Sequence, residues 1–206
     1  MNLSDYARRL NFESGFGHLP PAILMTDWAR LADPGPVLSA LPPGAAVLYR
    51  NTESPSRGEE TRRLKTLCRQ RGLLLIVAED ALLAQETRAD GLHLSEKTAR
   101  LSGRARAWNM RPGALLTIAV HSPAALRRAA AMGADAALLS PLFATRSHPG
   151  RAALGIQKFV NWGRRAPLPV YALGGITAGN ARRLAHSGAA GIAAIGGWTE
   201  TGPLDR

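Results

Sequence analysis

The sequence predicts an α/β protein, specifically a single-domain (β/α)8 TIM barrel with a short or missing last helix. Short apolar, β-rich segments alternate with helical patterns along the chain, and eight such strand segments can be counted. Several are apolar almost throughout, as expected for parallel strands that are covered on both faces. Eight repeats favour a closed barrel, and an open doubly wound sheet, which more often has about five or six strands, is the structural alternative.

The expected strands recur at regular intervals, and they are 22–27, 45–50, 73–79, 91–95, 114–120, 136–143, 169–175 and 191–197. The segments between them carry helix start and stop signals. Ser122 and Pro123 open one helix as N-cap and first-turn proline, and Gly133 closes it. Asp80 can cap a helix that begins at Ala81, and Thr177 and Gly188 are expected to bracket another (residues as in).

The domain organisation follows from the absence of any internal linker or low-complexity tract. Residues 1–22 are expected to form a helical N-terminal extension and residues 23–206 the barrel. Only the segment 198–206 follows the last strand, which is too short for a full eighth helix. The N-terminal segment 4–10 is a candidate to pack over that gap.

The net charge of +11 raises the question of a nucleic-acid partner. All but three of the 26 basic residues are arginines, and they are scattered as pairs along successive helices rather than gathered in a run. Aromatic residues make up only 5% of the chain, too few for a base-stacking platform. We therefore expect no specific nucleic-acid binding and a preference for anionic small molecules.

The sequence also bounds the compartment and the redox chemistry. No apolar stretch approaches the roughly 20 residues of a membrane helix, and the N-terminus does not resemble a secretory signal. We expect a cytoplasmic protein without a membrane partner. Cys68 is the single cysteine, which excludes an internal disulfide and a multi-cysteine metal site, and we expect it to be buried with Leu64 and Leu67 on one helical face.

Two neighbouring strands end on glycine pairs, Gly174-Gly175 and Gly196-Gly197. Loops at the carboxyl ends of barrel strands build the active site, and a phosphate commonly binds the loops after the seventh and eighth strands. Glycines let the backbone approach an anion closely with its N–H groups, and a helix starting near Thr177 would add partial positive charge. Glycine can also end a strand simply because the chain bends there, but two doublets on adjacent units favour a phosphate site.

Further segments, taken with these glycines, resemble the thiamine phosphate synthase and thiazole tautomerase superfamily, which includes TenI-like proteins. The similar segments are ADGLHLSEK (89–97), VHSPAALRRAAAMGAD (120–135), SPLFATRSH (140–148), YALGGIT (171–177) and GAAGIAAIGG (188–197). They occur in the family's order over nearly the whole chain from residue 23. The resemblance implies the same eightfold barrel.

The synthase joins a pyrimidine diphosphate to a thiazole phosphate and expels pyrophosphate with magnesium, which requires carboxylates for the metal and cations for the departing charge. Here the sequence departs from the family pattern. The Gln-x-Arg-x-Lys motif after the second strand keeps only Arg50, and the Asn-Asp pair after the third strand becomes Ala78-Glu79. The later aspartate falls on Thr98, and the lysine of the sixth loop falls on His148.

By this resemblance the ligands of the thiazole phosphate are mostly retained. Thr145 and Ser147 keep hydroxyl groups in the sixth loop, and both glycine doublets supply backbone donors. Arg50 and Glu79 are expected to bind substrate, with a rim ion pair of Arg50 to Glu53 or Glu79 as the alternative. His148 replaces the lost lysine as a substrate contact or is simply solvated.

The tautomerases of the family move a proton on a thiazole carboxylate phosphate without metal or diphosphate, a reaction that suits a histidine. His121, after the fifth strand, matches the histidine they use and is the expected catalytic residue. The alternative is that His121 only orders the strand end. His93 lies inside a strand and is expected to make a buried hydrogen bond.

The functional hypothesis is therefore a thiamine-biosynthesis protein that binds a phosphorylated thiazole, foremost a thiazole tautomerase with His121 as acid and base. A thiamine phosphate synthase and a non-catalytic binder of thiazole phosphate or thiamine phosphate are the alternatives. No metal or other cofactor is expected, except Mg²⁺ if the synthase alternative holds. The sequence leaves a homo-oligomer open.

Overall fold

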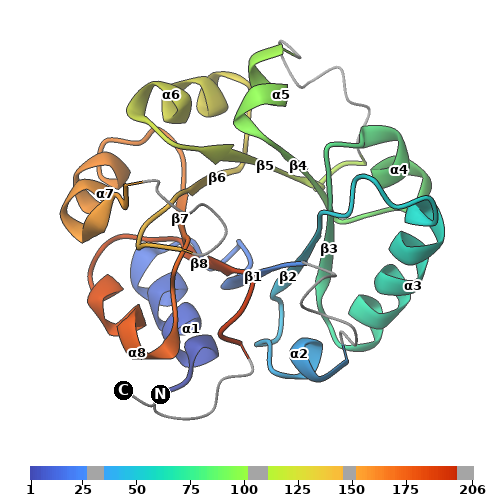
Figure 1. Ribbon diagram of the computed structural model, residues 1–206, viewed down its shortest axis with the longest axis horizontal. Helices are drawn as coiled ribbons and strands as arrows, with labels where there is room; N and C mark the ends of the chain where they lie inside the picture. Colours follow the sequence, from blue (N-terminus) through green and yellow to red (C-terminus); the bar gives the residue numbers. More distant parts are fainter. Residues whose placement is uncertain (27–34, 102–110, 146–151, 199–206) are drawn as a thin grey trace.

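The computed structural model describes residues 1–26, 35–101, 111–145 and 152–198. Eight parallel strands close into a barrel in which each strand pairs with its neighbours in sequence and β8 pairs with β1 (Figure 1). The strands are β1 (Ala22–Met25), β2 (Ala46–Tyr49), β3 (Leu74–Ala78), β4 (Gly91–Leu94), β5 (Leu115–Val120), β6 (Ala136–Leu139), β7 (Val170–Leu173) and β8 (Gly191–Ala194). The predicted closed barrel is confirmed, and the open sheet is wrong.

Helices surround the barrel; α1 precedes β1, and α2 to α8 follow β1 to β7 in order (Figure 1). They are α1 (Leu3–Ser14), α2 (Gly35–Ser39), α3 (Arg57–Gln70), α4 (Ala81–Glu86), α5 (Glu96–Leu101), α6 (Pro123–Ala131), α7 (Gly155–Gly163) and α8 (Ala178–Ala181), with a 3₁₀ turn at Arg182–Leu184. No helix in these described ranges is long and apolar enough to cross a bilayer.

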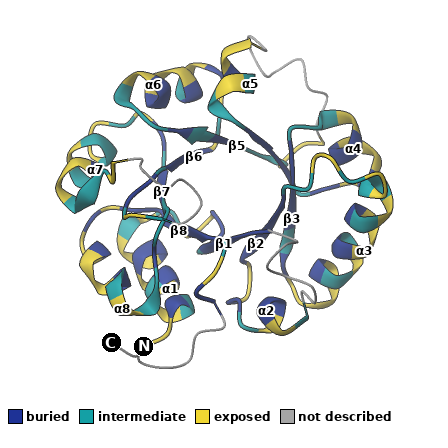
Figure 2. Cartoon of the chain, viewed as in Figure 1, coloured by how far each residue is buried: buried dark blue, intermediate teal, exposed yellow. Residues whose placement is uncertain are grey.

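The strands divide the core into two layers because successive side chains point to opposite faces. In β1, Ala22 and Leu24 belong to the outer cluster beneath the helices, whereas Ile23 and Met25 belong to the cluster inside the barrel. Each helix turns its buried residues toward the strands and its exposed residues outward (Figure 2). This two-sided burial explains why the strand segments are apolar almost throughout.

The helix signals behave as their chemistry predicts. The Asp80 carboxylate accepts from the Leu83 amide at 2.9 Å, and the Ser122 hydroxyl accepts from the Ala125 amide at 3.2 Å, which confirms both N-caps. Gly133 follows α6 with φ +79°. The helix expected between Thr177 and Gly188 is much shorter than predicted, because α-helical hydrogen bonding ends at Ala181 and a 3₁₀ turn follows.

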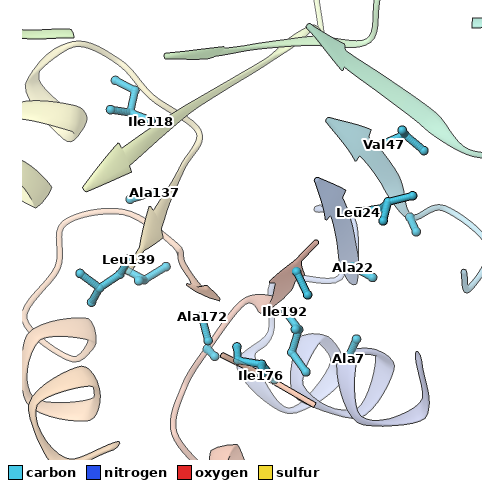
Figure 3. Packing of buried hydrophobic residues seen from close by; sticks show 14 of the residues in the cluster. Ala7, Ala22, Leu24, Val47, Ile118, Ala137, Leu139, Ala172, Ile176 and Ile192 are labelled. Carbon is cyan, nitrogen blue, oxygen red and sulfur yellow. The ribbon is translucent and has the colours of Figure 1, made fainter. Parts of the chain in front are cut away.

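Helix α1 packs beside β8 and α8 (Figure 1). Its residues Leu3 and Ala7 are buried in the same cluster as Ile192 of β8 and Ile176 after β7 (Figure 3). The Asn11 side chain donates to the carbonyls of Ala190, at 2.9 Å, and of Leu19, at 3.3 Å. The N-terminal segment therefore packs on β8, the strand after which the sequence leaves no room for a full helix, as expected.

Cys68 is fully buried on α3 beside Leu64. Burial is the main cause that raises the pKa of its thiol to about 12, so the thiolate is scarce at neutral pH. The side chain acts as a small apolar residue of the core.

Candidate active site

A cavity of about 610 Å³ opens at the carboxyl ends of the strands. The polar residues that line it lie at the ends of six different strands or just beyond them, and they are Thr26, Arg50, Asn51, Thr52, Glu79, His93, Ser95, His121 and Ser140. A larger hollow of about 760 Å³ lies at the other end of the barrel, around Arg8, Phe12 and His18. We place the candidate active site in the smaller cavity, because barrel enzymes assemble their catalytic groups from the loops after the strands.

Arg50 stands at the end of β2 and is held by the end of β1. Its backbone amide donates to the Thr26 hydroxyl at 3.0 Å, and its Nε donates to the Thr26 carbonyl at 3.2 Å. Arg50 also lines the cavity. Its guanidinium is thus oriented at the mouth, where a planar fork of donors suits a phosphate or a carboxylate.

Glu79 follows β3 in a left-handed backbone conformation, with φ +63°. Its amide donates to the His93 carbonyl at 2.8 Å, which extends the pairing of β3 with β4 by one residue. One carboxylate oxygen accepts from the Ser95 amide, and the other accepts from the Thr98 hydroxyl. The two positions where the family pattern has carboxylates are therefore in contact here, as a carboxylate and a hydroxyl.

Arg57 fixes the backbone on both sides of Glu79. Its guanidinium donates to the Ala78 carbonyl and, at 3.0 Å, to the Asp80 carboxylate. The guanidinium lies over the Tyr49 ring at 5.9 Å, and its Nε is buried without a hydrogen-bond partner. Arg57 therefore favours the uncommon backbone conformation that aims the Glu79 carboxylate toward β4.

His93 points into the barrel, because Leu92 and Leu94 on either side of it belong to the outer cluster. Its Nδ1 lies 2.9 Å from the hydroxyl of Thr117, its partner on β5, which confirms the buried hydrogen bond expected for it. Burial, with a smaller contribution from the charge of Arg50, lowers the pKa of His93 to about 3. His93 therefore presents a neutral imidazole at the floor of the cavity.

His121 lies at the end of β5 and lines the cavity. Its Nδ1 is 2.8 Å from the Ser140 carbonyl oxygen, which can only accept, so Nδ1 carries the hydrogen. In the neutral ring the lone pair is then on Nε2, the nitrogen that can take up a proton. The backbone amide of His121 donates to Glu96 at 3.1 Å, which further fixes the strand end.

The two glycine doublets lie after adjacent strands, β7 and β8. A Cβ on Gly197 would lie 3.4 Å from the Ile176 carbonyl and 3.7 Å from the Thr177 Cα, so the two turns approach each other. Gly174 (φ +101°), Gly175 (φ +65°) and Gly197 (φ +86°) adopt left-handed conformations. These turns need glycine for their backbone geometry, with or without a ligand.

The amide groups of the four doublet glycines donate no hydrogen bond to any residue within the described ranges. The Thr177 amide does donate, to the Asn180 side chain at 2.9 Å, and α8 is a single turn. The partial positive charge expected from a helix at Thr177 is therefore small, and the doublet amides remain the candidate anion donors.

The sixth loop is described only as far as Thr145. Its backbone contacts the first doublet, since the Phe143 amide donates to the Gly174 carbonyl at 3.0 Å and a Cβ on Gly175 would meet the Ala144 carbonyl at 2.3 Å. Thr145 directly follows this contact. Ser147 and His148, both expected at the substrate, lie outside the described residues.

The described residues at the mouth do not fit a magnesium ion held by the protein. Magnesium binds through one or two carboxylates in near-octahedral oxygen geometry. Within the described ranges Glu79 is the carboxylate that lines the cavity, and both of its oxygens already accept hydrogen bonds from the chain. Asp80 caps α4 and pairs with Arg57, and no cluster of three potential ligands occurs among the described residues.

Several polar groups at the cavity were not singled out from the sequence: Thr26, Asn51, Thr52, Ser95 and Ser140. Each lies one or two residues beyond the end of a strand, or, for Thr52, three. Position after an apolar run is therefore the signal that identifies them, because side chains there face the mouth of a parallel barrel.

Comparison with known proteins connects this barrel to one family. The family model described as thiamine monophosphate synthase matches residues 34–197. A thiamine-phosphate synthase of Bacillus velezensis is 31% identical over 174 residues, which cover 80% of this chain and 76% of that protein. A thiamine-phosphate synthase of Chromobacterium violaceum is 34% identical over 163 residues, with 77% of each chain covered.

Among solved structures, the thiamine phosphate pyrophosphorylase from Pyrococcus furiosus superposes with a TM-score of 0.69. The match covers 87% of this chain and 88% of that chain at 24% identity. It supports the barrel architecture and the order of its elements.

Proposed function

Because the chain belongs to the thiamine monophosphate synthase family, we propose that it joins a pyrimidine diphosphate to a thiazole phosphate, releasing pyrophosphate and thiamine phosphate. The similarity to relatives named thiamine-phosphate synthase carries this proposal. In the reaction the bond from the pyrimidine methylene carbon to the diphosphate oxygen breaks, and that carbon bonds to the thiazole nitrogen. No redox step is required.

The chain's own residues would divide the two anionic ends of the substrates between them. The doublets after β7 and β8 would hold the thiazole phosphate through backbone amides. Arg50, across the mouth at the end of β2, would face the departing diphosphate and stabilise its charge. The neutral His93 and the hydroxyl of Ser140 would contact the pyrimidine and thiazole rings, which would lie between the phosphate and the diphosphate.

Proton transfer on a thiazole carboxylate phosphate is a second candidate function, and the geometry of His121 favours it. The bond from Nδ1 to the Ser140 carbonyl leaves Nε2 as the basic nitrogen at the cavity. A bound substrate at Nε2 could exchange a proton with this nitrogen. This isomerase chemistry needs neither the diphosphate nor a metal.

The deciding experiment supplies the purified protein with both phosphorylated substrates and Mg²⁺ and measures thiamine phosphate by chromatography. Enzyme-dependent product is the expected result, and its absence at high protein concentration would overturn the transferase proposal. A parallel sample with the unaromatised thiazole carboxylate phosphate follows the ultraviolet change. Acceleration by the wild type that is lost in His121→Ala, but kept in the exposed-residue control His186→Ala, would establish the isomerase instead.

Binding of thiazole phosphate alone, measured by calorimetry, completes the design. Saturable binding with turnover in neither assay would identify a non-catalytic binder and reject both enzymatic functions.

A further inference from the structure

The edge of the cavity formed by β3 and β4 carries a connected set of contacts. Glu79 receives the Ser95 amide on one carboxylate oxygen and the Thr98 hydroxyl on the other. The Ser95 hydroxyl in turn donates to Thr98 at 3.1 Å and accepts from the Thr98 amide at 3.1 Å. The end of β3 is thus tied to the start of α5 through one carboxylate.

Contacts of the backbone, separate from those of the carboxylate, also favour this arrangement. Glu79 has the left-handed conformation, and Arg57 holds the Ala78 carbonyl and the Asp80 carboxylate on either side of it. The Glu79 amide continues the β3–β4 pairing through the His93 carbonyl. The direction of the side chain therefore follows from the backbone.

A divalent cation at this edge would have to replace the chain's own donors. Magnesium loses its water ligands reluctantly and demands near-octahedral oxygen geometry. Binding it through Glu79 would turn the Ser95 N–H and the Thr98 O–H away from their acceptor, and a half-buried donor that loses its acceptor costs free energy. Without substrate phosphates, one carboxylate that already accepts two hydrogen bonds offers little charge in return.

We infer that Glu79, Ser95 and Thr98 form a hydrogen-bonded clasp that occupies this edge in place of a cation site, so that the protein alone binds no Mg²⁺ there. The clasp joins the ends of β3 and β4. The side chain at position 98 determines whether this edge forms the clasp or a cation site. A carboxylate at 98 would repel Glu79 and create the paired ligands that a divalent cation bridges. This inference concerns the protein without substrates and stands apart from the proposed reaction.

The test measures thermal unfolding and calorimetric Mg²⁺ binding of the full chain without substrates. The wild type is expected to show neither a saturable heat of binding nor a rise in melting temperature with MgCl₂. Thr98→Asp is expected to melt lower without the metal, to recover with it, and to show the saturable Mg²⁺ binding that the wild type lacks. Thr66→Asp, which adds a carboxylate on the exposed face of α3, is the matched control and gains no response.

Thr98→Val keeps the shape and removes the hydroxyl, so it tests the clasp without any metal. It is expected to lower the melting temperature by about 2–4 °C, because one carboxylate oxygen loses its donor. A wild-type melting temperature in Thr98→Val refutes the clasp. Saturable Mg²⁺ binding by the wild type that disappears in Glu79→Gln refutes the absence of a cation site.

These outcomes are separable from failure of the proposed function. If the protein forms no thiamine phosphate, the melting and calorimetric measurements with Mg²⁺ alone still test the clasp. If the clasp is refuted, the two-substrate assay still decides the reaction.

Discussion

The two sides of the cavity mouth are built from different chemical groups. After β7 and β8 the candidate donors are backbone amides in turns that require glycine, such as Gly175 with φ +65°. After β2, β3 and β4 the polar groups are side chains, namely the Arg50 guanidinium, the Glu79 carboxylate and the Thr98 hydroxyl that donates to it. A site made of backbone keeps its chemistry while the turn persists, whereas one side-chain replacement can change what the other edge binds.

The largest expected effect lies on the glycine side. Gly175→Ala forces a Cβ to within 2.3 Å of the Ala144 carbonyl at a positive φ, so we expect a loss of about 3 kcal/mol or more in the free energy of unfolding. Urea denaturation followed by circular dichroism measures it. Gly196→Ala is the matched control, because a Cβ there meets nothing within 4 Å and should leave stability unchanged. Equal stability of the two variants would show that the turn does not depend on glycine.

On the side-chain edge, Arg50→Gln should impair function rather than folding. Losing a charged donor to a diphosphate is expected to lower kcat/KM in the two-substrate assay roughly tenfold to a hundredfold. Stability should change little, since the backbone bond from residue 50 to Thr26 remains. Arg9→Gln, on the outside of α1, is the control and should keep full activity. Unchanged kcat/KM in Arg50→Gln would show that Arg50 does not stabilise the departing diphosphate.

Arg57→Met should lower the free energy of unfolding, because Arg57 supports the backbone on either side of Glu79. It removes the donor to the Ala78 carbonyl and the ion pair with Asp80, whose side chain is 35% exposed, so we expect a modest loss of about 1–2 kcal/mol. Urea denaturation of Arg57→Met beside Arg62→Met, an exposed arginine on the same helix, gives the comparison. Similar curves for the two variants would contradict the role of Arg57 in holding Glu79.

The last prediction is a pH dependence of stability at His93, on the floor of the cavity. Its folded pKa of about 3 lies below its ordinary value of 6.5, so the unfolded chain takes up the proton first. The contribution of neutral His93 to the free energy of unfolding is complete above about pH 6.5. It is lost as the pH falls toward 3, by at most about 1.4 kcal/mol per pH unit. Urea denaturation at pH 7 and pH 5 should show a larger decrease in the free energy of unfolding for the wild type than for His93→Gln. His186→Gln, an exposed histidine, should retain the wild-type difference, and identical losses in all three proteins would refute the assignment.

The sequence by itself determined the barrel and the places where its chemistry gathers. Eight apolar runs can be counted because parallel strands buried on both faces must be apolar, and Asp80 and Ser122 are recognisable because caps act within three residues. The positions of Arg50, Glu79, His121 and the glycine doublets after strands were visible for the same local reason. The length of α8 was not, because a four-residue helix is decided by packing against α1.

Only the tertiary structure decided which of these groups meet. Glu79 and Thr98 are 19 residues apart, and their hydrogen bond exists because β3 pairs with β4 and because Arg57, from another helix, fixes the backbone at Glu79. His121 acquires its tautomer from a carbonyl on the next strand. Such contacts depend on the register between strands and on backbone conformation, which local sequence patterns do not specify.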